Sequence, residues 1–203
     1  MSFETIFTSP IMAILRGFSP DETTRLAWIA WDAGIEAVEV PIGRPEHVAA
    51  LRAAVGAGKA VGKQVGAGTV ISEDQVHAAV RAGATYTVAP GFDPDVLAAS
   101  TAAGLPHLPG VATATELQRA AAAGCGWVKA FPAMSLGPSW FRDIRGPFPD
   151  VKLVATGGIT AQTAEEFLDA GASVAAVGSA LSDPAQLPAL AKIVIDRFRF
   201  PGR

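Results

Sequence analysis

The sequence predicts an α/β protein built from eight successive strand–helix units. Eight apolar runs start about 20 to 26 residues apart, roughly the length of one compact βα unit. Most of the runs are continuously apolar rather than alternating, as in parallel strands that helices cover. At five places an Ala-Gly pair stands between an Ala-rich stretch and the next run, where Gly can end a helix. Eight units favour a closed (β/α)8 TIM barrel, and an open doubly wound sheet is the alternative.

The predicted elements follow one another in chain order. The strands are expected at Ile11–Arg16, Ala37–Ile42, Lys63–Val70, Thr85–Pro90, His107–Val111, Trp127–Pro132, Lys152–Gly158 and Val174–Ser179. Helices are expected over Asp21–Ala33, from Ser72 onward, and over Thr113–Ala123, Thr160–Ala170 and Asp183–Phe198. Pro20, Asp21 and Glu22 suit a first helical turn, and Ser72 suits a helix cap.

The composition fits one globular domain over residues 1–203. Half of the residues are hydrophobic, 17% are charged and the net charge is −3, which excludes intrinsic disorder. The single cysteine, Cys125, excludes a disulfide scaffold. Scattered basic residues argue against nucleic acid as a partner, and no apolar run is long enough for a membrane span. Residues 1–10 lack the basic start of a signal peptide, so we expect a cytoplasmic protein.

Three charged residues interrupt the apolar runs. Arg16 ends the first run, Glu39 lies in the second and Lys129 lies in the sixth. Charged side chains are rarely buried without a partner, and strands do not need them. They could form structural ion pairs in the barrel wall. Their similar depth, late in each strand, instead favours an active site, because the carboxyl ends of barrel strands carry the catalytic residues.

The types of these residues indicate carbon–carbon bond chemistry on a 2-oxo acid. Burial disfavours a charged ammonium group, and the neutral amine of Lys129 could attack a carbonyl and form a Schiff base. Glu39 could move protons while that adduct forms and breaks down. Arg16 could hold a carboxylate through two parallel hydrogen bonds.

Glycine-rich segments at the ends of the last two runs predict a phosphate site. Gly157-Gly158 follows Thr156, and Gly178-Ser179 ends the eighth run. Bare backbone can bring N–H groups close to an anion, and barrels often bind phosphate after strands seven and eight. Tight turns alone would be the alternative explanation. In Gly66-Ala67-Gly68 we expect the glycines to let a substrate approach the third strand, with the Thr69 hydroxyl available to bind it.

No metal or cofactor is expected. His47, His77 and His107 lie far apart, without the spacing of metal ligands. Cys125 has no activating partner near it in the sequence, so a buried, inert thiol is expected.

Six motifs resemble one family in the family's order. They are Ala13-Ile14-Leu15-Arg16-Gly17, Glu36-Ala37-Val38-Glu39-Val40-Pro41, Gly66-Ala67-Gly68-Thr69-Val70, Ala112-Thr113-Ala114-Thr115-Glu116, Lys129-Ala130-Phe131-Pro132 and Gly157-Gly158-Ile159. The sequence resembles the class I aldolases that cleave 2-keto-3-deoxy-6-phosphosugar acids. The motifs cover nearly the whole chain.

The resemblance implies a TIM barrel, a homotrimer and a retro-aldol cleavage that yields pyruvate and glyceraldehyde 3-phosphate. Lys129 matches the Schiff-base lysine and Glu39 the general acid/base. Arg16 and Thr69 match pyruvate-binding residues, and Pro90 matches a proline that lines the substrate site. The match to the phosphate site comprises Gly157, Gly158, Gly178 and Ser179.

Two branches of the family differ in the sugar acid. The gluconate type usually has Thr after Val-Glu-Val and Arg four residues past the Glu, where this chain has Pro41 and Gly43. Pro41 and the Ala-Thr-Ala-Thr-Glu stretch resemble the galactonate type, which we therefore expect. Thr156 resembles the gluconate type and leaves that epimer as the alternative. A sugar-phosphate isomerase or epimerase, a metal-dependent aldolase and a non-catalytic phosphosugar-binding barrel remain the other candidates.

Overall fold

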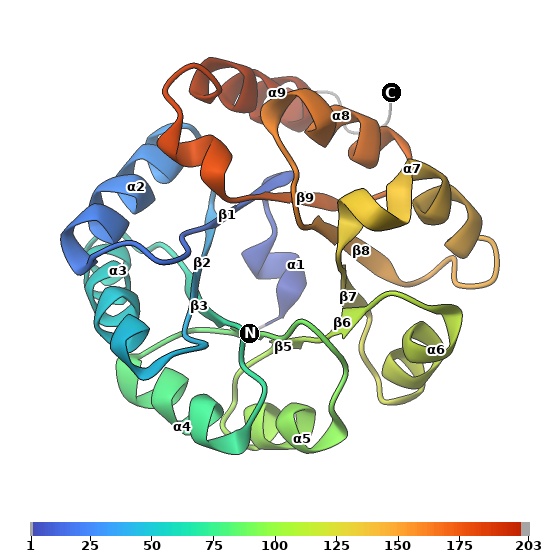
Figure 1. Cartoon of the computed structure of the whole chain (residues 1–203), viewed down its shortest axis with the longest axis horizontal. Helices are drawn as coiled ribbons and strands as arrows, with labels where there is room; N and C mark the ends of the chain where they lie inside the picture. Colours follow the sequence, from blue (N-terminus) through green and yellow to red (C-terminus); the bar gives the residue numbers. More distant parts are fainter. Residues whose placement is uncertain (1, 200–203) are drawn as a thin grey trace.

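The computed structural model describes residues 2–199, so the expected domain ends at Met1 and Arg203 lie outside it. A ring of parallel strands is enclosed by helices (Figure 1). The strands are β1 (Ile11–Ile14), β2 (Ala37–Pro41), β3 (Val65–Gly68), β4 (Thr87–Val88), β5 (His107–Leu108), β6 (Gly110–Val111), β7 (Trp127–Ala130), β8 (Lys152–Thr156) and β9 (Val174–Val177).

The order of the strands confirms the predicted barrel and excludes the doubly wound sheet. It runs β5-β4-β3-β2-β1-β9-β8-β7-β6, and neighbouring strands pair in parallel. β5 and β6 are the expected fifth strand, which is divided at Pro109 because proline has no N–H to donate. The Pro109 carbonyl accepts a hydrogen bond from the Lys129 N–H at 2.8 Å. The barrel therefore closes across this residue.

Helices on the outside connect the strands. They are α2 (Pro20–Asp32), α3 (Val48–Ala60), α4 (Glu73–Ala82), α5 (Pro94–Ala102), α6 (Ala114–Ala122), α7 (Ala133–Ile144) and α8 (Ala161–Asp169), with short 3-10 turns η1 (Pro45–His47) and η2 (Ser179–Ser182). The helix α1 (Phe3–Ile6) precedes β1, and α9 (Leu187–Arg199) follows β9. Hydroxyl caps begin several of the helices. Ser72 accepts from the Gln75 N–H, and Thr113 forms a capping box with Glu116.

The five Ala-Gly helix ends are confirmed. The glycine of each pair, at positions 34, 83, 104, 124 and 171, has a positive φ. Gly83 shows the reason, because its φ of 83° is a left-handed cap conformation that a side chain would strain.

Apolar side chains fill two regions, one outside and one inside the ring of strands. The larger core lies between the strands and the helices around them. The inner cluster includes Met12, Tyr86 and Trp127, and Phe3 and Ile6 of α1 pack against it. Since Met12, Ala37 and Trp127 lie near the starts of their strands, α1 closes the amino-terminal end of the barrel (Figure 1).

Most strands end one or two residues earlier than predicted. β1 ends at Ile14, so Arg16 lies in the following loop and not in a strand. The apolar pattern continues past the last ladder hydrogen bond because loop residues at the barrel end, such as Leu15 and Ile42, are also buried. Within the part of the chain that is described, no helix has the length and apolarity to cross a membrane.

Candidate active site

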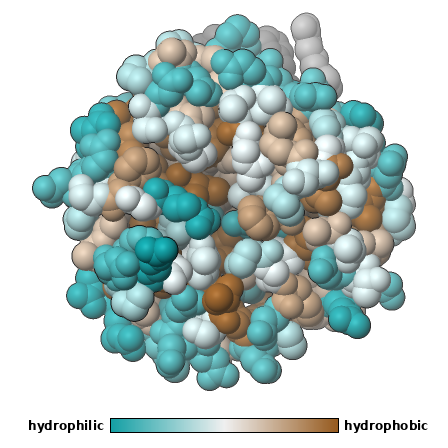
Figure 2. All heavy atoms as spheres, viewed as in Figure 1, coloured by the Kyte–Doolittle hydropathy of each residue, from teal (hydrophilic) through white to brown (hydrophobic). Residues whose placement is uncertain are grey.

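A cavity of about 520 Å³ opens at the carboxyl ends of β1, β7, β8 and β9. Seven of the predicted site residues line it: Arg16, Lys129, Thr156, Gly157, Gly158, Gly178 and Ser179. Hydrophilic residues dominate the rim of this face, and apolar side chains appear nearer the barrel axis (Figure 2). The barrel thus brings together residues that are up to 163 positions apart in the sequence, from Arg16 to Ser179.

Lys129 occupies the third position of β7 and points into the barrel. Only 3% of the residue is exposed. Its Nζ atom lies 5.3 Å from the centre of the Phe131 ring, a cation–π contact. Within residues 2–199, no ion pair joins Lys129, Glu39 or Arg16 to an opposite charge. The alternative explanation, a structural ion-pair network in the barrel wall, therefore does not describe these residues.

Glu39 is fully buried in the middle of β2. Like Thr69, it is not among the residues that line the cavity. Neither carboxyl oxygen has a hydrogen-bond partner, and such an orphaned group is expensive to bury. Burial raises the pKa of Glu39, and the charges of Lys129 and Arg16 oppose that rise. A buried carboxyl group with a raised pKa holds its proton more readily than an ordinary glutamate, which suits proton transfer.

The two glycines of β3 make room for side chains from neighbouring strands. A Cβ on Gly68 would lie 1.7 Å from Glu39 Oε1, and a Cβ on Gly66 would lie 2.1 Å from Tyr86 Cε2. The expectation that these glycines let a substrate approach β3 was therefore wrong. Glu39 and Tyr86 already fill that space.

Arg16 and Thr69 lie next to each other at the barrel mouth. The Arg16 Nη2 atom donates to Thr69 Oγ1 at 3.5 Å. Thr69 has a φ of 59°, the left-handed region that a β-branched residue rarely adopts. A Cβ on Gly43 would lie 2.9 Å from Thr69 Cγ2, so the bare Gly43 accommodates this conformation. Strained residues persist where the surrounding structure holds them, and they are common at functional sites.

The predicted phosphate segments border the same cavity. Gly157 and Gly158 have φ values of 110° and 76°, so only glycine adopts this turn without strain. Gly178 precedes η2, and Ser179 is exposed at the mouth. Thr156 is buried, and its hydroxyl donates weakly to the Val154 carbonyl at 3.4 Å. These segments leave bare backbone facing the cavity where an anion could bind.

Pro90 is not among the residues that line this cavity. It follows β4 at the carboxyl end, and its carbonyl carbon would lie 2.2 Å from a Cβ on Gly110. Sequence reasoning also missed Phe18 and Phe131, which line the cavity. Phe131 could have been found, because it lies two residues after Lys129 and alternate residues of a strand share a face.

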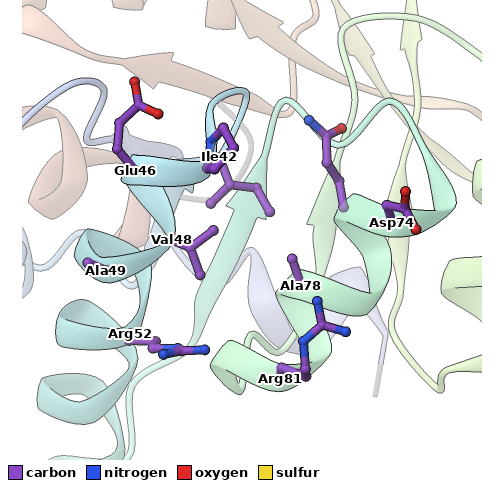
Figure 3. Close-up of a pocket in the computed structure, with 10 residues that line it drawn as sticks. Ile42, Glu46, Val48, Ala49, Arg52, Asp74, Ala78 and Arg81 are labelled. Atoms are coloured by element: carbon purple, nitrogen blue, oxygen red, sulfur yellow. The ribbon is translucent and has the colours of Figure 1, made fainter.

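A second hollow of about 590 Å³ lies between α3 and α4, outside the barrel. Arg52 extends from α3 and Arg81 from α4 into this groove (Figure 3). Both arginines are exposed, and the groove contains none of the predicted site residues. The volume of a hollow therefore does not identify the active site. The two buried titratable residues, Lys129 and Glu39, identify it. In the described segment, 2–199, no three His, Cys, Asp or Glu side chains gather as a metal site.

Comparison with known proteins places this geometry in a family. A family model described as KDPG and KHG aldolase matches residues 4–194. The chain belongs to this aldolase family. It is therefore a lyase, and the family resemblance seen in the six motifs is confirmed.

Individual relatives agree with the family match. The 2-dehydro-3-deoxy-6-phosphogalactonate aldolase of Escherichia coli is 37% identical over 175 residues, which cover 85% of this chain and 84% of the relative. The native KDPGal structure is 32% identical with a TM-score of 0.85, over 95% of this chain and 98% of that one. The KDPG aldolase of Legionella pneumophila, solved with pyruvate captured as a covalent carbinolamine, is 28% identical with a TM-score of 0.80, over 93% of each chain.

Proposed function

We propose that this aldolase cleaves 2-dehydro-3-deoxy-6-phosphogalactonate into pyruvate and D-glyceraldehyde 3-phosphate through a Schiff base on Lys129. The observation that carries the proposal is the pair of buried groups, Lys129 and Glu39, held at one barrel end without an ion pair. Each is left free for chemistry with a ligand. The galactonate-type relative at 37% identity and the carbinolamine in the Legionella enzyme support the substrate and the covalent step.

Schiff-base formation begins with the neutral amine of Lys129. Its nitrogen attacks C2 of the 2-oxo acid, and a proton passes from that nitrogen to the former carbonyl oxygen to give a carbinolamine. Glu39 delivers a proton to that hydroxyl, which leaves as water, and the nitrogen lone pair forms the iminium. The buried carboxyl group suits this step because its raised pKa keeps a proton available.

Carbon–carbon cleavage follows from the iminium. The Glu39 carboxylate, which gave up its proton in the dehydration, takes the proton of the C4 hydroxyl. The aldehyde carbonyl then forms, the C3–C4 bond breaks and its electron pair passes into an enamine. Glyceraldehyde 3-phosphate leaves. Glu39 returns that proton to C3 of the enamine and regenerates an iminium, and addition of water to C2 releases pyruvate and free Lys129.

Two groups of residues bind the substrate. Arg16 and Thr69 hold the carboxylate, with the guanidinium as the charged donor. The backbone of Gly157, Gly158 and Gly178 and the Ser179 hydroxyl hold the phosphate at the ends of β8 and β9. Pro90 follows β4 outside the cavity lining, so its contact with the substrate rests on the family resemblance alone. No cofactor takes part in this scheme, and the working assembly is a homotrimer located in the cytoplasm.

The test is incubation of the purified protein with pyruvate and sodium borohydride. Borohydride reduces an iminium to a stable amine, so mass spectrometry after digestion should place the added three-carbon unit on Lys129. A protein left unlabelled would refute the Schiff base. It would favour a metal-dependent aldolase, which EDTA inactivates, or a barrel that only binds or isomerises phosphosugars.

The epimer is tested by parallel cleavage assays. The galactonate and gluconate substrates differ at C4, and pyruvate release is measured for each under the same conditions. We expect a higher kcat/KM for the galactonate substrate and measurable turnover of its epimer, which Thr156 favours. A preference for the gluconate substrate would assign the enzyme to the alternative branch.

A further inference from the structure

Tyr86 lies inside the barrel and has no place in the chemistry described so far. It is the only tyrosine of the chain. The residue precedes β4 and is fully buried in the inner cluster. Its hydroxyl donates to the Val38 carbonyl at 2.8 Å. The hydroxyl thus connects the start of β4 to β2.

The ring of Tyr86 and the carboxyl group of Glu39 occupy adjacent places over β3. The ring lies against Gly66 and the carboxyl group against Gly68. These glycines are two residues apart on one strand face, a separation of roughly 7 Å. Phe3 and Phe7 meet Tyr86 from below, with ring centres at 6.1 and 6.5 Å. Tyr86 therefore stands between the α1 end of the barrel and Glu39.

We propose that Tyr86 is a positioning residue for Glu39. Its hydroxyl fixes the backbone of β2 one residue before Glu39, and its ring forms an apolar floor that keeps water from reaching the carboxyl group from the amino-terminal side. This inference rests on the proposed role of Glu39 in proton transfer.

The groups that face Glu39 explain why the Tyr86 ring matters for the pKa of this carboxyl group. Arg16 and Lys129 approach from the mouth and from β7, and both lower the pKa of Glu39. Tyr86 faces it from β4, and β3 offers only bare Gly68. Burial and the Glu39 charge raise the pKa of Tyr86 well above its ordinary value, so the phenol stays neutral. Exclusion of water is then the effect that keeps the pKa of Glu39 raised.

The first test is Tyr86→Phe, which keeps the ring and removes the hydroxyl. We expect kcat to fall by roughly tenfold, because a displacement of about 1 Å can cost about a hundredfold in rate. KM should stay close to that of the wild type, since Arg16, Thr69 and the phosphate segments are untouched. The apparent pKa assigned to Glu39 in the kcat profile should move downward, because β2 is no longer fixed at Val38 and the carboxyl group can shift toward the water of the cavity.

The matched control is Thr87→Val on the neighbouring residue. The Thr87 hydroxyl is also buried and bonds to Ser100 and to His107, but on the outer face of the same strand. This variant should lower thermal stability and leave the pH profile unchanged. If both variants change the thermal stability and the pH profile of kcat equally, Tyr86 is only a structural residue and the proposal is overturned.

A second measurement works even if Tyr86→Phe folds poorly. Biosynthetic replacement with 3-fluorotyrosine labels position 86 alone, because the chain has no other tyrosine. The single fluorine resonance should shift over the pH range in which Glu39 titrates, and Glu39→Gln should abolish that shift. A resonance that ignores pH in the unsubstituted protein would overturn the proposal.

Failure of the proposed function gives a different result. If Glu39→Gln leaves turnover unchanged, Glu39 is not the proton-transfer group and the wider scheme fails. If Glu39→Gln slows turnover while Tyr86→Phe leaves both kcat and its pH profile as in the wild type, only the role of Tyr86 fails.

Discussion

The carboxyl group of Glu39 lies directly against the α-carbon of Gly68. A Cβ at position 68 would stand 1.7 Å from Oε1 and 2.4 Å from the carboxyl carbon. Glu39 and Gly68 sit on paired strands, with Glu39 opposite Gly66 in the register and Gly68 two residues further along. The missing side chain on β3 is therefore what gives the Glu39 carboxyl group its place.

Gly68→Ala should displace that carboxyl group while leaving the barrel folded. Its φ lies outside the left-handed region, so alanine fits the backbone, and the atom in the way ends a side chain that can move. We expect turnover to drop by about a hundredfold, measured as pyruvate release. Gly56→Ala in α3 is the control, because nothing lies within 4 Å of its added Cβ. If both variants keep full turnover, the position of Glu39 does not limit the reaction.

Lys129→Ala should abolish cleavage and leave the fold intact. The truncated side chain cannot form the Schiff base, while no ion pair of the described residues is lost. Circular dichroism checks the fold, and borohydride with pyruvate should give no covalent label. Residual cleavage in a folded Lys129→Ala protein would show that another group performs the carbonyl chemistry.

Glu39→Gln should slow turnover by about a hundredfold or more and also stabilise the protein. A raised pKa means that the folded state holds the proton more tightly than the unfolded state. The stability contributed by Glu39 is then complete below its unfolded pKa and declines as pH rises through the folded pKa. We expect the variant to gain about 1 kcal/mol at pH 8 and less at pH 5, measured by urea unfolding. A constant difference across pH would contradict this.

Thr69→Gly should raise the stability of the protein and weaken its binding of the substrate. Glycine adopts the φ of 59° freely, so the variant should gain about 1 kcal/mol from relief of backbone strain. It also loses the hydroxyl that meets Arg16, so KM for the substrate should rise several-fold. Thr69→Ser keeps the hydroxyl and should retain the wild-type KM. A higher KM in both variants would assign the loss to something other than the hydroxyl.

His107 should govern stability in acid. Burial lowers its pKa to about 4, and its Nδ1 atom faces Thr87 Oγ1 at 2.9 Å. A lowered pKa means that the contribution of this residue is complete above the unfolded value near 6.5 and is lost as pH falls through 4. Between pH 7 and 4, the free energy of unfolding of His107→Asn should therefore fall by on the order of 3 kcal/mol less than that of the wild type. Parallel unfolding curves between pH 7 and 4 would contradict the prediction.

The barrel and the reacting groups could be predicted because each leaves a local signal. Ala-Gly helix ends recur five times and apolar runs eight times along the chain, and Glu39 and Lys129 are rare charges inside such runs. Arg16 was expected inside a strand because Leu15 continues the apolar pattern, although the ladder ends at Ile14. At strand ends, the apolar pattern of the sequence continues past the last hydrogen bond between strands.

Contacts between residues of different strands left no local signal in the sequence. Gly66 and Tyr86 are 20 residues apart, and only the pairing of β3 with β4 shows that the ring needs the missing side chain. Tyr86 is otherwise an ordinary core aromatic. Pro109 could have indicated that the fifth strand is divided, since proline interrupts a central strand.

The helix α1 at the amino-terminal end of the barrel determines the route by which substrate enters and products leave. Phe3 and Ile6 fill that end, so the cavity at the carboxyl ends of the strands serves as both entrance and exit. In the proposed reaction the phosphorylated aldehyde lies nearer the solvent, and the three-carbon remainder stays bonded to Lys129 behind it. Departure is then sequential, with the aldehyde first. High concentrations of glyceraldehyde 3-phosphate should accordingly re-enter ahead of water and drive the condensation of the two fragments.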